Sequence, residues 1–460
     1  MADFSLTEVL KATAGRLTNV GGGKFFRGIS TDTRTVQPGN LFIALVGERF
    51  DGHEFVAQAV SKGAVGVIVS RSVHVSEHAQ VIEVKDTLKA LQALARFHRK
   101  RYHIPVIGVT GSNGKTTTKD MLAAVLSSRF NVLKTEANFN NEIGLPLTLL
   151  KLESGHEVAV VEMGMRARGE IRELTEIAIP TVGVVTNVGE THMEILGSIE
   201  NIADAKAELV EAIVQDDLVV LNADDPFVRA MQNKAKGRVI LYGLNQGAFV
   251  RAENIATGGN GELITTFDCC SPRGTFPVVL HTVGTHNVYN ALAAIAVGWE
   301  LGLKPSEIKK GIASFVSGAM RLEIKKYGEY TVINDVYNAS PLSMAAALNT
   351  LADIGNGRKI AILGDMLELG DAAIDAHCRI GRQAAEQGVE VVLTVGELSK
   401  HIASAARECG VKVTQSFSRH KEAIEALRDL LKPGDYILLK GSRGMKMETM
   451  LEAFSDTSLL

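Results

Sequence analysis

The 460-residue chain has few cysteines, and their spacing excludes several kinds of site. The four are Cys269, Cys270, Cys378 and Cys409. Two of them are adjacent, which is unfavourable for a disulfide, and none shows the Cys-x-x-Cys spacing of a zinc site. We therefore expect reduced thiols and a cytoplasmic protein.

An excess of charge and long apolar runs are also missing. The formal net charge is −3, so there is no general attraction to nucleic acid or to acidic membranes. No run approaches the roughly 18 apolar residues of a membrane-spanning helix. The first residues lack a basic segment followed by an apolar stretch, so we expect no signal peptide. We predict a protein that neither spans a membrane nor binds nucleic acid, and we expect a monomer.

A chain of this length exceeds one ordinary core, so several domains are expected. Three regions separate by pattern, and we predict domains over residues 1–86, 87–317 and 318–460. The first is a small α/β domain. Its expected elements are strands at 41–46, 65–69 and 81–84 and a helix at 54–62, with a further helix at 87–100 leading onward.

The second and third regions alternate apolar strands with helices, which is typical of parallel α/β sheets. Strands are predicted at 158–161, 182–186 and 218–221, then at 330–334, 359–363, 391–395 and 436–439. Residues 251–281 suggest a β excursion from the second domain, followed by a helix at 291–301. The third region resembles a Rossmann-like unit without a phosphate loop of its own.

The segment from Ile104 to Asp120 combines an apolar strand, a Gly-rich turn and a helix predicted over 120–127. This is the layout of a phosphate-binding loop, in the short Thr-Gly-x-x-Gly-Lys-Thr form. Glycines let backbone N–H groups approach an anion, and the helix start adds a favourable dipole. Lys115 can contact β/γ phosphates, and the Thr116 hydroxyl can bind Mg²⁺. The predicted nucleotide-binding residues are Gly111, Ser112, Asn113, Gly114, Lys115, Thr116 and Thr117.

Three polar residues follow predicted strands, where ligands of parallel α/β domains gather. Glu162 can hold Mg²⁺ as a Walker-B-like acid, although a solvent-facing terminal Glu has the same pattern. His192 is compatible with a site or with a structural histidine. Asp335 can bind ribose hydroxyls or cap the helix that starts at Ser340-Pro341.

Other candidates are weaker on pattern alone. Lys206 lies in a helix predicted over 202–213 and would be repelled by metal ions unless neutralised or modified. Arg321, at the junction of the second and third regions, can reach a γ-phosphate if the domains close, or can be an exposed linker residue. The hydroxyl-rich turn from Ser30 to Arg34 suits a second phosphate-bearing ligand, but solvated loops look the same.

Taken together and in order, these residues resemble the Mur ligases of bacterial cell-wall synthesis, over all three regions. The resemblance rests on Thr110–Thr118, Glu162-Met-Gly, Asn187–His192, Ala205–Glu208, His286–Ala294, Arg321-Leu-Glu and Asp335–Pro341. Two departures stand out: arginines in Glu162-Met-Gly-Met-Arg-Ala-Arg, and Val and Ser in Asp335-Val-Tyr-Asn-Ala-Ser. We expect both to affect fine substrate contacts.

The resemblance implies an α/β fold of three domains: a UDP-sugar domain, a central P-loop ATPase domain and a C-terminal Rossmann-like domain. It also implies an ATP-dependent amide ligation through an acyl phosphate, with Mg²⁺. Within the family, Asn138–Pro146 and Tyr337-Asn338 favour a member that joins D-alanyl-D-alanine to a UDP-N-acetylmuramoyl-tripeptide. The Asp-Asn-Pro-Arg signature of the enzyme that adds the third residue is absent from the sequence.

The resemblance further implies roles for individual residues. Lys115, Glu162, His192, Lys206 and Arg321 would be catalytic, and Thr116, Glu162, His192 and a carbamoylated Lys206 would serve the metal ions. Asn287, Asn290, Arg321, Asp335 and Tyr337 would contact ATP. The UDP-sugar would bind through Ser30, Thr31, Asp32, Arg34, Gly47, Asp51 and His53, and the acceptor peptides through Asn138, Asn140, Asn141, Asn338 and Ser340.

Three alternatives stay open. A sibling ligase would add a single amino acid to the same UDP-sugar. Folylpolyglutamate synthetase has the last two domains but no UDP-sugar domain. A P-loop NTPase switch would hydrolyse nucleotide slowly and have no small-molecule acceptor.

Overall fold

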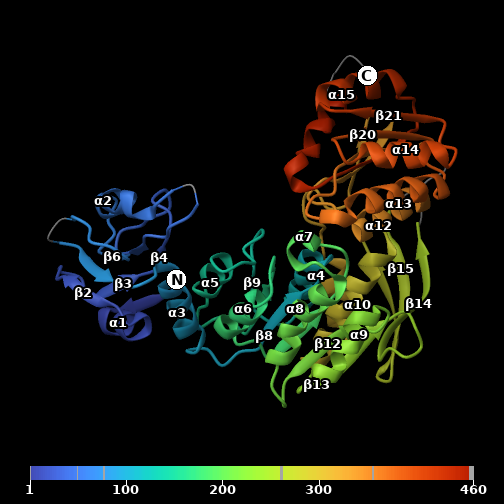
Figure 1. The fold of residues 1–460 in the computed structure, drawn as a ribbon. Helices are drawn as coiled ribbons and strands as arrows, with labels where there is room; N and C mark the ends of the chain where they lie inside the picture. Colours follow the sequence, from blue (N-terminus) through green and yellow to red (C-terminus); the bar gives the residue numbers. More distant parts are fainter. Residues whose placement is uncertain (1, 49, 76–77, 259–262, 355–356, 455–460) are drawn as a thin grey trace.

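The computed structural model describes residues 2–48, 50–75, 78–258, 263–354 and 357–454. Three large sheets follow one another along the chain, each in its own part of the molecule, and the N-terminal part extends away from the other two (Figure 1). No helix among these residues is long and apolar enough to cross a membrane.

The N-terminal part contains a five-stranded sheet of order β2-β7-β6-β5-β4, with parallel pairing from β7 to β4. A short antiparallel pair, β1 and β3, lies beside it. The elements are β1 (Asp3–Ser5), α1 (Leu6–Thr13), β2 (Arg16–Asn19), β3 (Phe25–Arg27), β4 (Ile29–Ser30), β5 (Leu41–Ile43), α2 (Val56–Ser61), β6 (Gly66–Val69), β7 (Gln80–Glu83) and α3 (Thr87–Arg99). The predicted strands and helices at 41–100 are confirmed, although β5 ends at Ile43 rather than at residue 46; β1 to β4 and α1 are additional.

The central sheet has nine strands in the order β16-β15-β14-β13-β12-β11-β8-β10-β9. Its strands are β8 (Val106–Thr110), β9 (Val132–Lys134), β10 (Val158–Glu162), β11 (Val182–Val185), β12 (Leu218–Asn222), β13 (Arg238–Gly243), β14 (Val250–Thr257), β15 (Thr265–Ser271) and β16 (Gly274–Leu280). Of residues 251–281, positions 259–262 lie outside the described residues, and most of the others are β structure, as predicted. They extend the main sheet: β14 pairs in parallel with β13, and only β15 and β16 turn antiparallel.

Helices cover both faces of the central sheet. They are α4 (Lys115–Leu126), α5 (Gly144–Leu149), α6 (Glu170–Ala178), α7 (Met193–Leu196), α8 (Ile199–Ala212), α9 (Pro226–Ala230), α10 (Thr285–Glu300) and α11 (Pro305–Ala313). Helices α4, α10 and α11 pack together over one face, and α6 packs with α8. The predictions placed the starts of α4 and α10 five and six residues too late (120 against 115, 291 against 285), because polar residues form their first turns.

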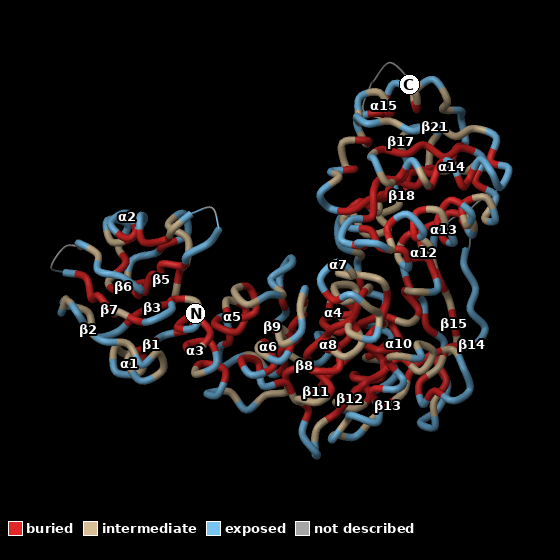
Figure 2. Tube along the Cα trace, viewed as in Figure 1, coloured by how far each residue is buried: buried red, intermediate tan, exposed pale blue. Residues whose placement is uncertain are grey.

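The C-terminal sheet has the order β17-β18-β22-β19-β20-β21, parallel except for β17. Its elements are β17 (Glu323–Tyr327), β18 (Tyr330–Asp335), α12 (Pro341–Asp353), β19 (Lys359–Gly364), α13 (Ala373–Glu386), β20 (Val391–Val395), α14 (Lys400–Glu408), β21 (Val413–Phe417), α15 (His420–Leu430) and β22 (Tyr436–Lys440). The four predicted strands are confirmed. The predictions missed β17 and β21, which lie at the sheet edges and are mostly polar. Figure 2 shows that the central and C-terminal sheets each carry their own buried layer.

Candidate active site

The loop between β8 and α4 has a geometry that requires glycine. Gly111 has φ +149°, and a Cβ there would lie 1.9 Å from Thr186 Oγ1. Gly114 has φ +79°, in the left-handed region. Neighbouring loops hold this turn in place: Asn113 N–H donates to Asn187 Oδ1 at 2.9 Å. The loop is therefore pre-shaped before any ligand binds.

The start of α4 is open toward an anion. Its N-cap, Gly114, offers no side chain to accept from the first N–H groups. Lys115 Nζ folds back on the loop and donates to the carbonyls of Gly111 and Ser112 at 2.8 and 3.2 Å. Desolvation lowers the pKa of Lys115, and the nearby Glu162 carboxylate opposes that effect.

Glu162 ends β10, the strand beside the phosphate loop, and is buried. Its Oε1 accepts from Asn140 Nδ2 at 2.8 Å, whereas its Oε2 is buried without a partner. A buried, unpartnered carboxylate oxygen beside a phosphate loop fits Mg²⁺. The described residues contain no group of three or more His, Cys, Asp and Glu that could hold a metal ion alone. Phosphate and water oxygens would therefore complete the coordination shell, as Mg²⁺ commonly requires.

His192 lies just before α7 and faces the C-terminal domain. Its Nδ1 lies 2.6 Å from Glu368 Oε2, close enough for an ion pair but without hydrogen-bond alignment. Both residues have left-handed backbones, with φ +57° and +64°. Such conformations are strained outside glycine and concentrate at functional sites. Desolvation lowers the pKa of His192. The positive charges of Lys206 and Lys115 lower this pKa further, whereas the Glu368 carboxylate opposes the shift.

Lys206 is buried on α8 behind the cavity and does not line it. Desolvation, with a smaller contribution from the charge of Lys115, lowers its pKa well below the usual value. Burial therefore favours the uncharged, nucleophilic form of this amine more than solvent would. It is not the ordinary surface lysine that its sequence position alone suggests.

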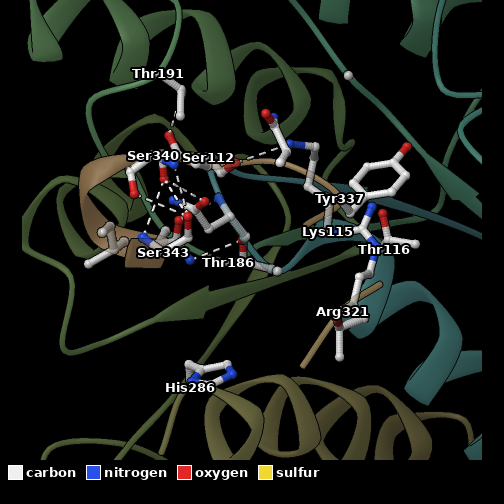
Figure 3. A pocket seen from close by; sticks show the side chains of 18 of the residues that line it. Ser112, Lys115, Thr116, Thr186, Thr191, His286, Arg321, Tyr337, Ser340 and Ser343 are labelled. Atoms are coloured by element: carbon white, nitrogen blue, oxygen red, sulfur yellow. Dashed lines mark hydrogen bonds between the residues drawn. The ribbon is translucent and has the colours of Figure 1, made fainter. Parts of the chain in front are cut away.

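The C-terminal domain forms the opposite wall. Asp335, at the end of β18, pairs with Lys440 at the end of β22. The Arg321 guanidinium lies over the Tyr337 ring, 3.8 Å from its centroid. Ser340 Oγ donates to Asn113 Oδ1 at 2.9 Å, which links this wall to the phosphate loop (Figure 3).

One cavity of about 1030 Å³ lies between these walls. The predicted residues that line it are Ser112, Asn113, Gly114, Lys115, Thr116, Thr117, Asn138, Asn140, Asn141, Glu162, His192, Asn287, Asn290, Arg321, Asp335, Tyr337, Asn338 and Ser340. Gly111 and Lys206 are not among its lining residues. Within the predicted set, Asn290 Oδ1 also accepts from Thr118 Oγ1 at 3.0 Å, which ties α10 to α4.

The seven residues predicted for the UDP-sugar lie in the N-terminal domain, away from this cavity (Figure 1). They are Ser30, Thr31, Asp32, Arg34, Gly47, Asp51 and His53. Two local networks organise them. The Asp32 carboxylate accepts from Arg34, and Asp51 binds His53 Nδ1 at 2.6 Å. His53 Nε2 accepts in turn from Ser70 N–H at 2.9 Å.

Sequence reasoning missed several lining residues. Lys440 directly follows a predicted strand, so the same strand-end rule that found Asp335 could have found it. Glu368 lies in a loop, and no local pattern marks it. The tertiary structure alone brings it to His192.

Comparison with known proteins places these features in a family. Three Mur ligase family models match in order: the family's catalytic domain over residues 26–99, the middle domain over 109–298 and the glutamate ligase domain over 320–443. A Bacillus subtilis protein named UDP-N-acetylmuramoyl-tripeptide–D-alanyl-D-alanine ligase is 42% identical over 436 residues, which cover 94% of each chain.

Two solved structures are also similar. One is UDP-N-acetylmuramoylalanyl-D-glutamyl-2,6-diaminopimelate–D-alanyl-D-alanyl ligase from Acinetobacter baumannii, with a TM-score of 0.86, 33% identity and 98% of each chain covered. The other is MurF ligase from Thermotoga maritima in complex with ADP, with a TM-score of 0.84, 28% identity and 93% of this chain and 97% of that chain covered. Matched in all three of its sheet domains, and by a relative that spans nearly its whole length, this chain belongs to the Mur ligase family.

Proposed function

We propose that this protein is an ATP-dependent, ADP-forming ligase that joins D-alanyl-D-alanine to the tripeptide carboxylate of UDP-N-acetylmuramoyl-tripeptide. One observation carries the proposal: a single cavity combines an open phosphate loop, an unpartnered carboxylate oxygen and a charged wall from a second domain. The names of the relatives supply the substrates. ATP and UDP-linked precursors are cytoplasmic metabolites, so we place this step of peptidoglycan precursor synthesis there.

The reaction must activate a carboxylate, which is a poor electrophile. A carboxylate oxygen takes the γ-phosphoryl group of ATP, giving an acyl phosphate and ADP. The dipeptide amine then attacks the carbonyl carbon, loses a proton, and phosphate leaves as the amide forms. The open N–H groups of the phosphate loop and Lys115 hold the β/γ phosphates, and Arg321 reaches the γ-phosphate. Positioning two anionic substrates supplies most of the rate enhancement.

Mg²⁺ fits the residues described above. Thr116 and Glu162 would hold one ion at the phosphates, and His192 a second near the acceptor carboxylate. Mg²⁺ supplies positive charge that neutralises transferring phosphate. In its uncharged form, which burial favours, the Lys206 amine can add to CO₂ with loss of a proton, and the resulting carbamate would be an anion beside Lys115 and His192.

The remaining predicted residues divide between the substrates. Asn287 and Asn290 would lie near the adenine, Asp335 near the ribose, and Tyr337 would also contact ATP; all four line the cavity. The dipeptide and the acceptor meet near Asn138, Asn140, Asn141, Asn338 and Ser340. The UDP-sugar binds the N-terminal domain at the seven residues named above. We propose a monomer with domains over 1–86, 87–317 and 318–460.

The alternatives are weaker for specific reasons. A switch NTPase does not need charged residues from a second domain to line the nucleotide cavity. A folylpolyglutamate synthetase would lack a domain equivalent to residues 1–86. A sibling ligase shares every feature of the cavity, so only substrate choice separates it.

The deciding experiment measures phosphate release from Mg·ATP with UDP-muramoyl-tripeptide, with and without D-alanyl-D-alanine, and identifies the product by mass spectrometry. We expect release and a UDP-muramoyl-pentapeptide only when both substrates are present. Release with a single amino acid and a shorter precursor would move the enzyme to an earlier step. Slow release that ignores every acceptor would favour the switch.

A further inference from the structure

Almost every charged side chain that lines the cavity has a partner within the protein. Contacts within the protein are made by the carboxylates of Glu162, Glu170, Glu173, Glu190, Asp224, Asp225, Asp335 and Glu368 and by the cationic groups of Lys115, Arg321, Lys440 and Arg443. Arg166 and Glu142 are the exceptions among the described lining residues: neither side chain has a hydrogen bond, ion pair or ring contact. Two opposite charges are thus left available to a ligand.

These two residues belong to one end of the cavity. Glu142 lies two positions after Asn140, and Arg166 two positions after Gly164. Gly164 N–H donates to the Asn140 carbonyl at 2.8 Å, so the two segments are held together. The approach is close: a Cβ on Gly164 would lie 3.0 Å from the Asn140 side chain. Both side chains line the same cavity, and no ion pair joins them, so each charge is available to a ligand in that cavity.

This end of the cavity faces the N-terminal domain. Helices α5 and α6, which border the two segments, pack against α3, the helix that leads out of that domain (Figure 1). If the UDP-sugar binds the N-terminal domain, its peptide must cross this end to reach Glu162 and the phosphate loop. Arg166 and Glu142 would then lie beside the last residue of the peptide, whose carboxylate reacts.

We propose that Arg166 and Glu142 form a subsite for the amino-acid end of a diamino-dicarboxylic third residue, such as 2,6-diaminopimelate. The inference rests on the proposed function. One end of such a residue is used in the peptide, and its other end carries an ammonium and a carboxylate on the same carbon. The Arg166 guanidinium matches that carboxylate, and the Glu142 carboxylate matches the ammonium.

The opposite charges of Arg166 and Glu142 distinguish the ammonium-and-carboxylate end of the third residue from the other charged groups of the substrates. A glutamyl residue in the peptide has one free carboxylate but no ammonium, so it would use Arg166 and leave Glu142 unpaired. A lysine in the third position has an ammonium but no carboxylate, so it would leave Arg166 unpaired. The zwitterionic end alone uses both charges.

The test compares two acceptors that differ at one group: UDP-muramoyl-tripeptides ending in meso-2,6-diaminopimelate or in L-lysine. Steady-state kcat and KM are measured for each with the wild-type protein, Arg166→Gln and Glu142→Gln. Affinity for each UDP-tripeptide without ATP is measured by calorimetry. Arg172→Gln is the matched control, because Arg172 is an exposed arginine on α6 that does not line the cavity.

We expect Arg166→Gln to raise the KM and weaken binding of the diaminopimelate acceptor by about 10- to 100-fold, since a hydrogen bond to a charged group is worth roughly 1.5–3 kcal/mol. The lysine acceptor should change by less than about threefold on the same scale, and kcat should change little. Glu142→Gln should weaken both acceptors, because both carry the ammonium. Arg172→Gln should behave as wild type.

Three results would overturn the proposal. Equal losses for both acceptors in Arg166→Gln would assign Arg166 to the glutamyl carboxylate. A raised KM for D-alanyl-D-alanine would assign it to the dipeptide. No change in either variant would remove the subsite. Failure of the proposed function is distinct, because the wild-type protein would then join the dipeptide to neither acceptor.

Discussion

The central and C-terminal domains both point the start of a helix at the cavity, but they treat that start differently. Helix α4 begins after Gly114, which provides no side-chain cap. Helix α12 begins after Ser340, whose hydroxyl accepts from Ser343 N–H in a capping box. The first helix keeps its N–H groups for an anion, whereas the second satisfies its own.

The difference shows why two similar parallel sheets contribute different chemistry. The central sheet contributes backbone donors and a carboxylate with a free oxygen. The C-terminal sheet contributes side chains, including the Asp335–Lys440 pair, and contacts that reach back to the central domain. The proposed reaction would therefore use the uncapped start of α4 on one side and the approach of the C-terminal domain on the other.

Removing the Lys115 ammonium group at the start of α4 should have the largest effect on turnover. We expect Lys115→Ala to lower kcat by about 10³-fold or more. The variant loses the fixed positive charge that stabilises the negative charge of the transferring phosphoryl group. Phosphate release measures the loss, and circular dichroism with thermal unfolding checks that the variant is folded. Near-normal turnover in a folded variant would contradict the phosphate-loop assignment.

The next largest effect should come from the contact between His192 and the C-terminal domain. Glu368→Gln removes the negative charge beside His192 Nδ1, and we expect kcat to fall about 10-fold, as for outer-shell partners of metal-binding histidines, with an unchanged KM for ATP. The control is Asp371→Asn, an exposed carboxylate nearby that does not line the cavity. Equal behaviour of the two variants would show that Glu368 does not act through His192.

Removing the Ser340 N-cap of α12 should affect the free energy of unfolding more than the rate of turnover. Ser340→Ala removes the cap of α12 and the hydrogen bond to Asn113, and we expect a loss of about 1 kcal/mol in the free energy of unfolding. Denaturant unfolding measures it. Ser340→Thr retains a hydroxyl and should recover most of the loss. If Ser340→Ala were as stable as wild type, the contrast between the helix starts would lose its support.

The smallest effect should come from the exposed ion pair between the two domains. Arg379 Nη2 lies 2.6 Å from Glu190 Oε2, and both side chains are partly in solvent. We expect Arg379→Gln to cost about 0.2–1 kcal/mol at low salt, and less at high salt. Unfolding measured at two salt concentrations tests this. A tenfold rise in KM for ATP would show instead that this pair holds the domains together.

Much of the fold followed from local pattern. Buried parallel strands are continuous apolar runs, so β8, β10, β11, β12 and β18 to β20 were predictable. The two edge strands of the C-terminal sheet, β17 and β21, were not, because they expose polar side chains. The sequence of residues 251–281 predicts strands, but whether they extend the main sheet depends on pairing between β13 and β14.

The site shows the same division. The sequence by itself determined the phosphate loop and the polar residues at strand ends, because a Gly-rich turn between strand and helix permits few backbone shapes. Only the tertiary structure decided which residues from distant segments meet, such as Glu368 at His192 and Ser340 at Asn113, and that burial lowers the pKa of Lys206. Contacts between domains and the desolvation of a charge depend on packing over the whole chain, and no local pattern encodes them.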